Sequence, residues 1–353
     1  MLRTISIVST QMQLVNSIEY IKKYNNEIAY NDLIICAASK QRTDQIQSLL
    51  SKPYYLNIFS SISFLLYGGS FLISHLHNLW LKYKIKFLLS KSKYDIIIIG
   101  NYLSIHHRFS QFIAWRSNPN IKFVLVDDGT ATAESVVLRD KEKETKRMQY
   151  YMCSRFLKMV FYDIEISFKK FVPNSLLFFT VYTQLDFKHD VAEKNNYFYL
   201  KSVDLFEGDS CKFGKGISII IGQPVVEVGL LSKVRYNLIL LSQVKELHKK
   251  NHKIVYVPHP AESQNSFDND DMKDCVTIFR PDVPLEMWVI STQPSEVIGF
   301  CSSALINIHY LLPDINLTSL FPEEVDLLKD SYLQSFKEAY AYISNIGVKM
   351  VCV

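Results

Sequence analysis

The sequence predicts two α/β domains, each built on a parallel β-sheet. The chain has 353 residues, which exceeds the roughly 100–200 residues that one ordinary core accommodates. Short apolar runs that end in polar or glycine residues recur along it, as is typical of buried parallel strands. Segments of helical length separate these runs, and this alternation of strand and helix indicates parallel-sheet domains.

Two series of strands define the expected domains. The first series has strands at 4–8, 32–36, 94–100 and 121–126 and helices at 11–23 and 104–116. After a polar stretch at 201–216, the second series has strands at 217–221, 253–257, 276–279 and 297–300 and helices at 233–250 and 304–312. We therefore expect one domain over residues 1–205 and another over 206–353. A final helix at 324–344 is expected, and whether it returns to the first domain stays open.

Residues 55–93 break the alternation. An apolar stretch at 58–73 is followed by five lysines: Lys82, Lys84, Lys86, Lys91 and Lys93. Serines and glycines interrupt the stretch, which falls short of the roughly 20 apolar residues of a membrane span. We expect a helical insertion here, packed on the first domain or on a partner subunit. The alternative is an interfacial segment whose basic flank is drawn to anionic lipid.

Composition excludes several classes of protein. The 39 basic and 35 acidic residues give a net charge of +4, too little to indicate nucleic-acid binding, although an anionic small substrate or a membrane surface fits. The six cysteines show no CxxC pair or zinc-like spacing and indicate reduced thiols in the cytoplasm. No long apolar run suggests a signal peptide at the N-terminus. No GxGxxG follows a predicted strand, which argues against an FAD or NAD enzyme.

The first motif that can carry chemistry is Asp127-Asp128-Gly129, directly after a buried strand. Ligands of open α/β sheets bind beyond the carboxyl ends of the strands, so these acids are expected to face a cleft. Adjacent carboxylates repel, which raises the pKa of one of them and suits it to take a proton from an alcohol. The alternative is an ordinary strand-to-loop turn.

The second motif is His259-Pro260, at the end of another strand and preceded by Pro258. The flanking prolines restrict the backbone and hold the imidazole in one direction. A protonated histidine can pair with a phosphate or protonate it as it leaves. The alternative is a structural histidine in a rigid turn.

The third motif is Ser302-Ser303, between a strand and a helix. Hydroxyls and free N–H groups at a helix N-terminus suit a phosphate, although simple capping needs no ligand. Together the motifs place a base in one domain and a phosphate site in the other.

These motifs resemble those of the bacterial sialyltransferases and polysialyltransferases, which carry an acidic-acidic-glycine motif, a His-Pro motif and a late Ser/Thr motif. Glu286 lies between the last two motifs, where members of this group carry a glutamate that suits the ribose hydroxyls of the donor. The segment from Ile219 through Gly222 and Gln223 to Pro224 is most similar to the lipooligosaccharide sialyltransferase branch.

The resemblance implies the GT-B fold, with two Rossmann-like domains facing a central cleft. It also implies inverting transfer of sialic acid from CMP-sialic acid, with neither a metal nor a cofactor. Asp127 would be the base and Asp128 would orient it, while Glu227 is the alternative base. The donor would be bound by Gly129, Gly222, Gln223, His259, Pro260, Glu286, Ser302 and Ser303.

The expected acceptor is a galactose-terminated glycan of lipooligosaccharide, O-antigen or capsule, free or lipid-linked. The enzyme would act in the cytoplasm or at the inner face of the inner membrane, and the related enzymes also allow a homodimer. A GT-B transferase that uses CMP-Kdo or a UDP-sugar stays open, as does a non-catalytic polysaccharide-assembly protein.

Overall fold

The computed structural model describes residues 1–66, 71–129, 131–145, 168, 171–203, 216–263, 275–323 and 333–353. The chain divides into two compact units, Met1–Val203 and Asp204–Val353. No helix in these described ranges has the length and apolarity needed to span a membrane.

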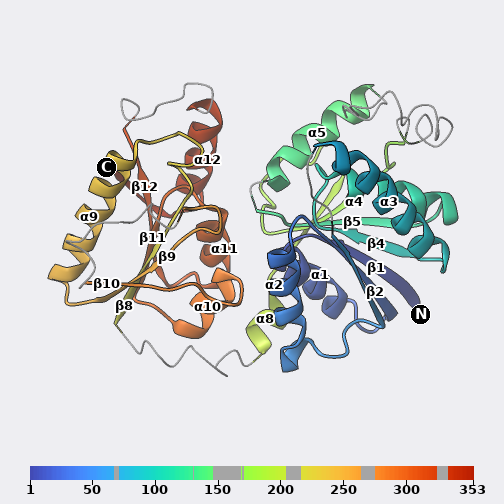
Figure 1. Cartoon of the computed structure of the whole chain (residues 1–353), viewed down its shortest axis with the longest axis horizontal. Coiled ribbons are helices and arrows are strands. Elements are labelled where there is room, and N and C mark those ends of the chain that lie inside the picture. Colours follow the sequence, from blue (N-terminus) through green and yellow to red (C-terminus); the bar gives the residue numbers. More distant parts are fainter. Residues whose placement is uncertain are drawn as a thin grey trace. The chain divides into compact units, whose positions relative to one another are not determined.

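The described residues of the first unit form a seven-stranded parallel sheet in the order β3-β2-β1-β4-β5-β6-β7 (Figure 1). Its strands are β1 Leu2–Val8, β2 Ile28–Ala37, β3 Ser61–Leu66, β4 Ile96–Ile99, β5 Lys122–Val126, β6 Leu177–Thr180 and β7 Val191–Lys194. Its helices are α1 Gln11–Lys23, α2 Lys40–Leu50, α3 Phe71–Ser90, α4 Ile105–Ser117, α5 Ala131–Thr145 and α8 Phe198–Ser202, with a short 3₁₀ turn at Pro53–Tyr55.

Helices cover both faces of this sheet, with α1 and α2 on one side and α3 and α4 on the other (Figure 1). The central strand β4 is four consecutive isoleucines, and all are buried. Strands buried on both faces lack the alternation of a one-sided strand, which is why β4 could be recognised from its apolar run.

The described residues of the second unit form a six-stranded parallel sheet in the order β10-β9-β8-β11-β12-β13. Its strands are β8 Ile217–Ile221, β9 Lys253–Val257, β10 Val276–Ile278, β11 Glu296–Gly299, β12 Asn316–Phe321 and β13 Lys349–Cys352. Its helices are α9 Lys233–Lys249, α10 Leu285–Thr292, α11 Ser303–Leu311 and α12 Leu333–Asn345. Helix α9 lies on one face, and α10, α11 and α12 lie on the other (Figure 1).

The prediction of a helical insertion at 55–93 was right that the segment holds a helix packed on the first unit, and wrong about the first part of the segment. The segment contains the edge strand β3, which pairs in parallel with β2, and the crossover helix α3 that leads to β4. Leu65 of β3 and Leu81, Ile85 and Leu89 of α3 share the core beneath the sheet. A continuous apolar run does not reveal whether it forms a strand or a helix, so its first part was misassigned.

The last helix packs within the second unit. The Tyr340 hydroxyl on α12 donates to the Leu320 carbonyl oxygen of β12 (2.6 Å) and accepts from the Cys301 N–H (3.1 Å). The chain then continues into β13, which pairs with β12. Helix α12 is therefore the crossover between the last two strands of the second sheet. Residues 324–332 of the predicted helix lie outside the described residues.

Candidate active site

In the first unit, the predicted acids lie at the carboxyl edge of the sheet. Strands β1, β4 and β5 are neighbours, so the segments that follow Val8, Ile99 and Val126 meet at one edge. Asp127 and Asp128 follow β5 directly. Because successive side chains of a strand point in opposite directions, the two carboxylates have different surroundings.

The Asp127 carboxylate is directed into the protein and is 1% exposed. Its Oδ1 accepts hydrogen bonds from the Thr132 and Thr180 hydroxyls (3.1 and 2.5 Å), and its Oδ2 accepts from the Val181 N–H (2.8 Å). Burial raises the pKa of Asp127 to about 7, although these donors favour the ionised form. The carboxylate therefore ties the end of β5 to the end of β6 and to α5.

The Asp128 carboxylate is half-buried at the edge itself. Its Oδ2 accepts a hydrogen bond from the Asn101 amide (2.5 Å). Burial raises the pKa of Asp128, whereas hydrogen bonds from Gln13 and Asn101 and the charge of Arg42 act in the opposite direction. Of the two acids, Asp128 is thus the one with an exposed surface.

Gln13 reaches Asp128 because residue 100 is glycine. A methyl group on Gly100 would overlap the Gln13 side chain. The Gln13 Oε1 accepts from the Ser9 N–H (2.7 Å), so the same amide also fixes the end of β1. A glycine that ends a buried strand marks a place where another group approaches closely.

A buried neutral histidine supports the same edge. Burial lowers the pKa of His107 to about 3. Its Nδ1 accepts from the Asn101 N–H (3.0 Å), which assigns the proton to Nε2, 2.8 Å from the Ser9 hydroxyl oxygen. Asn101 in turn accepts from the N–H groups of Leu103 and Ser104 at the start of α4. The orientation of Asn101 is therefore fixed on both sides.

Gly129 adopts a left-handed conformation, with φ +63°, which glycine reaches without strain. The turn lets α5 begin at Ala131, and the Thr132 hydroxyl accepts from the Asp128 N–H (3.3 Å) while it donates to Asp127. Gly129 thus shapes the turn that carries the acids.

In the second unit, the predicted residues also gather at the carboxyl edge. Strands β9, β8 and β11 are neighbours, and His259, Gly222 and Ser302 follow them. Helix α10, which begins with Leu285 and Glu286, leads into β11 from the same edge. The structure therefore brings together segments that are far apart in sequence.

The His259 turn is held by a buried glutamate that the sequence did not indicate. The Glu262 Oε2 accepts from the His259 N–H (2.6 Å), and its Oε1 accepts from the hydroxyls of Tyr236 (2.8 Å) and Tyr256 (2.7 Å). Burial raises the pKa of Glu262, which the tyrosine hydrogen bonds oppose. The His259 Nδ1 accepts from the Ala261 N–H (3.1 Å), so the proton of the neutral imidazole lies on Nε2.

Gly222 provides the room for this network. A methyl group at this position would overlap the Glu262 carboxylate and the Tyr256 hydroxyl. The next residue, Gln223, donates its N–H to the Tyr236 hydroxyl (3.2 Å). The ends of β8 and β9 are thus joined through one carboxylate and two phenols.

The serines behave as a helix start. Ser302 is the N-cap of α11, and its hydroxyl accepts from the Ala304 N–H (3.2 Å). Ser302 is 6% exposed, while Ser303 is half-buried. The N-terminus of α11, where N–H groups are free of helical partners, lies directly beside the end of β8.

Two predicted residues have partners of their own. Glu286 is 5% exposed, its Oε1 accepts from the Asn307 amide (2.9 Å) on α11, and burial raises its pKa. Glu227 is exposed and its Oε1 accepts from the Ser263 N–H (2.8 Å). Glu227 therefore connects the loop after β8 with the His259 turn. Pro260 is exposed next to His259.

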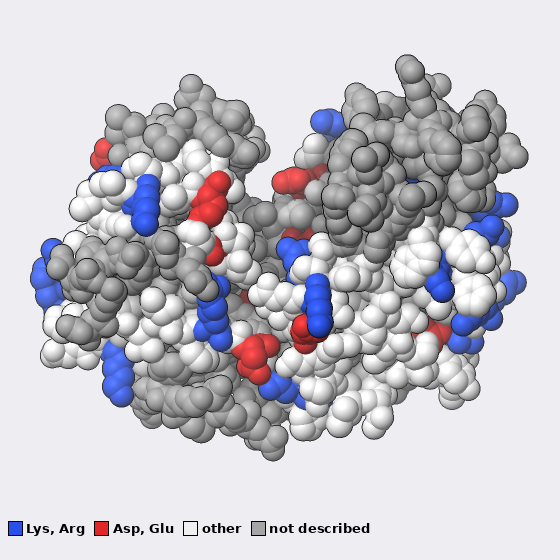
Figure 2. Space-filling model, viewed as in Figure 1, with Lys and Arg blue, Asp and Glu red and all other residues white. Residues whose placement is uncertain are grey.

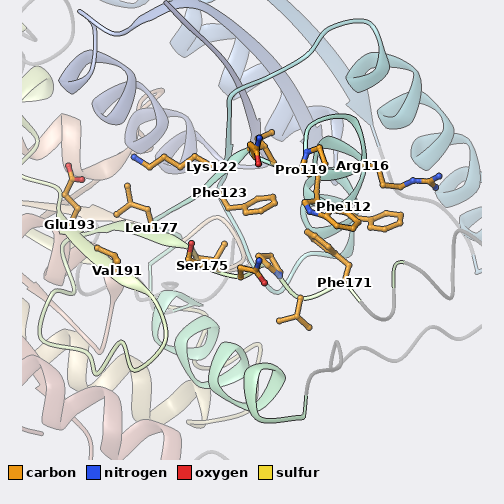
Figure 3. A pocket seen from close by; sticks show the side chains of 17 residues that line it. Phe112, Arg116, Pro119, Lys122, Phe123, Phe171, Ser175, Leu177, Val191 and Glu193 are labelled. Atoms are coloured by element: carbon orange, nitrogen blue, oxygen red, sulfur yellow. The ribbon is translucent and has the colours of Figure 1, made fainter.

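A groove of about 800 Å³ lies at the opposite edge of the first sheet (Figure 3). Its lining includes Lys122, Leu177 and Val191 at the starts of β5, β6 and β7, together with aromatic residues such as Trp115 and Phe171. Asp127 and Asp128 are at the other end of β5, so this groove is separate from the candidate site. In the described ranges, no three His, Cys, Asp or Glu side chains form a group that could hold a metal ion.

Solved structures of low sequence identity share the fold of the chain. UDP-GlcNAc 2-epimerase from Methanocaldococcus jannaschii aligns with a TM-score of 0.60 and 10% identity, over 99% of this chain and 88% of that chain. UDP-N-acetylglucosamine 2-epimerase from Rickettsia bellii gives 0.53 and 13%, over 92% and 80%. TcCGT1 in complex with UDP gives 0.54 and 11%, over 100% and 86%. The predicted GT-B fold is confirmed.

Sequence comparison identifies the family. No curated protein matches the chain. The family model described as alpha-2,8-polysialyltransferase (POLYST) matches residues 4–321, nearly the whole chain. This match confirms the resemblance drawn from the motifs and favours an enzyme over a non-catalytic assembly protein. The chain belongs to the alpha-2,8-polysialyltransferase family and is a glycosyltransferase of the sialyltransferase type.

Proposed function

We propose that the protein transfers sialic acid from CMP-sialic acid to a hydroxyl group of a bacterial surface glycan, with inversion and without a metal. One observation carries this proposal. His259, Gly222 and the Ser302-Ser303 helix start follow three neighbouring strands of one sheet, and this is an arrangement that suits a nucleotide phosphate.

The second unit is proposed to hold CMP. Gly222 and Gln223 follow β8 at the carboxyl edge, and the α11 N-terminus offers N–H groups and the positive end of its dipole to the phosphate. His259 Nε2 points away from the backbone contact made by Nδ1 and can donate to a phosphate oxygen. A protonated His259 then stabilises the negative charge that grows on CMP as the bond breaks.

Glu286 is proposed to contact the ribose hydroxyls. Asn307 occupies one carboxylate oxygen, Oε1, so the contact falls to Oε2. Because the side chain is 5% exposed, this contact requires a local rearrangement around Glu286.

The structure favours Asp128 over Asp127 as the base. Asp127 is buried and accepts three hydrogen bonds from within the unit, so a glycan hydroxyl cannot reach it without breaking them. Asp128 is half-buried at the edge and is oriented by Gln13 and Asn101. We therefore reverse the roles expected from the sequence and assign Asp127 to the support of the turn. Glu227, whose Oε1 accepts from the Ser263 N–H, is assigned a role in holding its loop against the His259 turn.

The proposed reaction is a single displacement. The acceptor hydroxyl gives its proton to Asp128 as its oxygen attacks the anomeric carbon of sialic acid. The bond from that carbon to the CMP phosphate oxygen breaks, and its electron pair leaves with CMP. Attack from the face opposite CMP inverts the anomeric configuration. His259 and the start of α11 compensate the charge of the departing phosphate.

The acceptor is proposed to be a galactose-terminated or sialic acid-terminated glycan. The first follows from the motif resemblance, and the second from the alpha-2,8-polysialyltransferase description of the family. A lipid-linked acceptor would place the enzyme at the inner face of the inner membrane.

Calorimetric titration of CMP into the full-length protein tests the donor site without an acceptor. We expect His259→Ala and the double variant Ser302→Ala/Ser303→Ala to weaken CMP binding by about tenfold or more, because each removes a donor to a charged phosphate worth roughly 1.5–3 kcal/mol. Asp128→Asn, in the other unit, is the matched control and should bind CMP as wild type does. Binding of UDP in preference to CMP would instead assign a UDP-sugar donor.

A further inference from the structure

Charge is segregated along the chain in a way that the proposed chemistry does not explain. Residues 45–94 contain six lysines and no aspartate or glutamate, and this segment alone carries more positive charge than the net +4 of the entire chain. The segment includes the edge strand β3 and helix α3. Neither contributes a residue to the candidate active site.

One face of α3 carries large aromatic residues in contact with solvent. Trp80, Tyr83 and Phe87 are 47%, 63% and 49% exposed. Spacings of three and four residues place them on a single side of the helix. The opposite side is fixed in the core by three side chains of 0% exposure: Leu81, Ile85 and Leu89. The aromatic face is therefore held outward by a helix that is anchored to the sheet.

Lysines accompany these rings. The Lys84 ammonium nitrogen lies 5.5 Å from the Trp80 ring centroid, and the Lys91 ammonium nitrogen lies 4.6 Å from the Phe87 ring centroid. Basic side chains gather along the edge of the first unit where α3 runs (Figures 1 and 2). The exposed face thus combines aromatic rings with ammonium groups that lie close to them.

This combination fits a lipid surface better than a protein surface. Interfaces between proteins are enriched in aromatic residues but depleted in lysine. At a membrane surface, Trp and Tyr rings settle at the headgroup level, and lysines are attracted to anionic lipid. The lack of acidic residues over 45–94 removes the repulsion that anionic headgroups would otherwise meet.

We propose that the outward face of α3, formed by Trp80, Tyr83, Lys84 and Phe87, is together with Lys91 directly after the helix a docking surface for the anionic headgroups of a membrane. Because the other side of α3 is buried in the core, the helix rests on the lipid surface and does not enter it lengthwise. This surface would hold the enzyme at the membrane location named in the proposed function, whichever donor and base the enzyme uses.

Vesicle sedimentation tests the surface. The full-length protein is expected to sediment with vesicles of phosphatidylcholine and phosphatidylglycerol, and far less with phosphatidylcholine alone. Raising the salt concentration from about 0.1 M to about 1 M shortens the screening length from roughly 10 Å to roughly 3 Å and should release the protein from the vesicles. Lys84→Ala/Lys91→Ala should weaken binding about 25-fold, since each lysine near an anionic surface contributes a factor of roughly five.

The aromatic side chains are tested by Trp80→Ser/Tyr83→Ser/Phe87→Ser, which should abolish sedimentation with the anionic vesicles. The matched control is Tyr30→Ser/Phe198→Ser, which removes aromatic residues of 58% and 66% exposure from the same unit and should leave binding unchanged. Wild-type protein that sediments with neither vesicle, or α3 variants that bind as wild type does, would overturn the proposal.

Two further readouts separate the alternatives. If a second copy of the chain occupies this surface, light scattering would show a dimer for wild type and a monomer for the aromatic variant. That result would overturn the lipid proposal.

Acceptor-stimulated CMP release with a soluble acceptor should be unchanged in the α3 variants. Vesicle binding without any transfer activity would defeat the proposed function alone, whereas transfer activity without vesicle binding would defeat the docking surface alone.

Discussion

Replacement of each acid of the Asp127-Asp128 pair by asparagine separates their roles. In Asp128→Asn the side chain keeps its size and can still contact Asn101 and Gln13, but it cannot take a proton. A positioned general base contributes about 10²–10⁴-fold to the rate, so we expect kcat to fall by that factor while CMP binding is retained.

Asp127→Asn should act on stability instead. An amide can accept from the Val181 N–H, but its NH₂ group replaces the oxygen that accepts from the two threonine hydroxyls, and the disturbed hydrogen bonds cost about 1–3 kcal/mol. The cost depends on pH. Burial raises the folded-state pKa of Asp127 to about 7 from the ordinary value of 3.8, so wild-type stability falls as pH rises from about 4 to 7, by up to about 4 kcal/mol.

The asparagine variant lacks this titration. Its unfolding free energy relative to wild type should therefore improve as pH rises through this range. The measurements are kcat from CMP release and unfolding free energy from urea titration at pH 5 and pH 8. Asp127→Asn should keep kcat within about tenfold of wild type. Loss of activity in a folded Asp127→Asn protein, with an active Asp128→Asn protein, would refute the assignment of Asp128 as the base.

Three further predictions concern the supports of the site. Gly222→Ala should displace the Glu262 carboxylate and lower the affinity for CMP at least several-fold, as measured by calorimetry. Unchanged affinity would show that the hydrogen bonds of Glu262 do not position the His259 turn. In the first unit, the buried Arg108 of α4 donates to both carboxylate oxygens of Glu142 on α5 (2.6 and 2.7 Å). Glu142→Gln leaves the Arg108 charge without its charged partner, which should cost about 3–5 kcal/mol of stability. A change in Tm within error would contradict this. Burial lowers the folded-state pKa of His107 to about 3 from 6.5, so stability should be lost as pH falls from about 6.5 towards 3. In urea titrations, His107→Asn should flatten this loss. An equally steep loss in the variant would show that other groups dominate the pH dependence.

The central strands and the motif positions could be predicted from the sequence because each depends on local pattern. Helix α1 and strands β8 and β9 have the predicted bounds, since apolar runs bounded by polar residues mark them. Once the strands are assigned, parallel pairing requires that the motifs after β5, β9 and β11 lie at carboxyl edges. The candidate site could therefore be located before any side chain was placed.

The environment of each acid could not be predicted. Whether Asp127 or Asp128 is buried depends on Thr180 and Val181 at the end of β6, a strand that was not predicted and is far away in sequence. Gln13 and Glu262 were missed because neither belongs to a motif. A signal was available in Gly100 and Gly222. Each of these glycines ends a strand run and leaves room for the side chain of Gln13 or Glu262, respectively.

The edge strand β3 was misassigned and the place of the last helix stayed open for a related reason. Their placement is decided by partners remote in sequence: β3 by pairing with β2, and α12 by the strand β13 that follows it. An apolar run alone carries no information about such pairing.

The most direct test of the central claim is mass spectrometry of the acceptor after incubation with CMP-sialic acid and EDTA, using galactose-terminated and sialic acid-terminated oligosaccharides. We expect acceptor products that are heavier by sialic acid, with release of CMP, for wild type and not for Asp128→Asn. Unmodified acceptors with CMP-sialic acid, together with products from CMP-Kdo or a UDP-sugar, would contradict it.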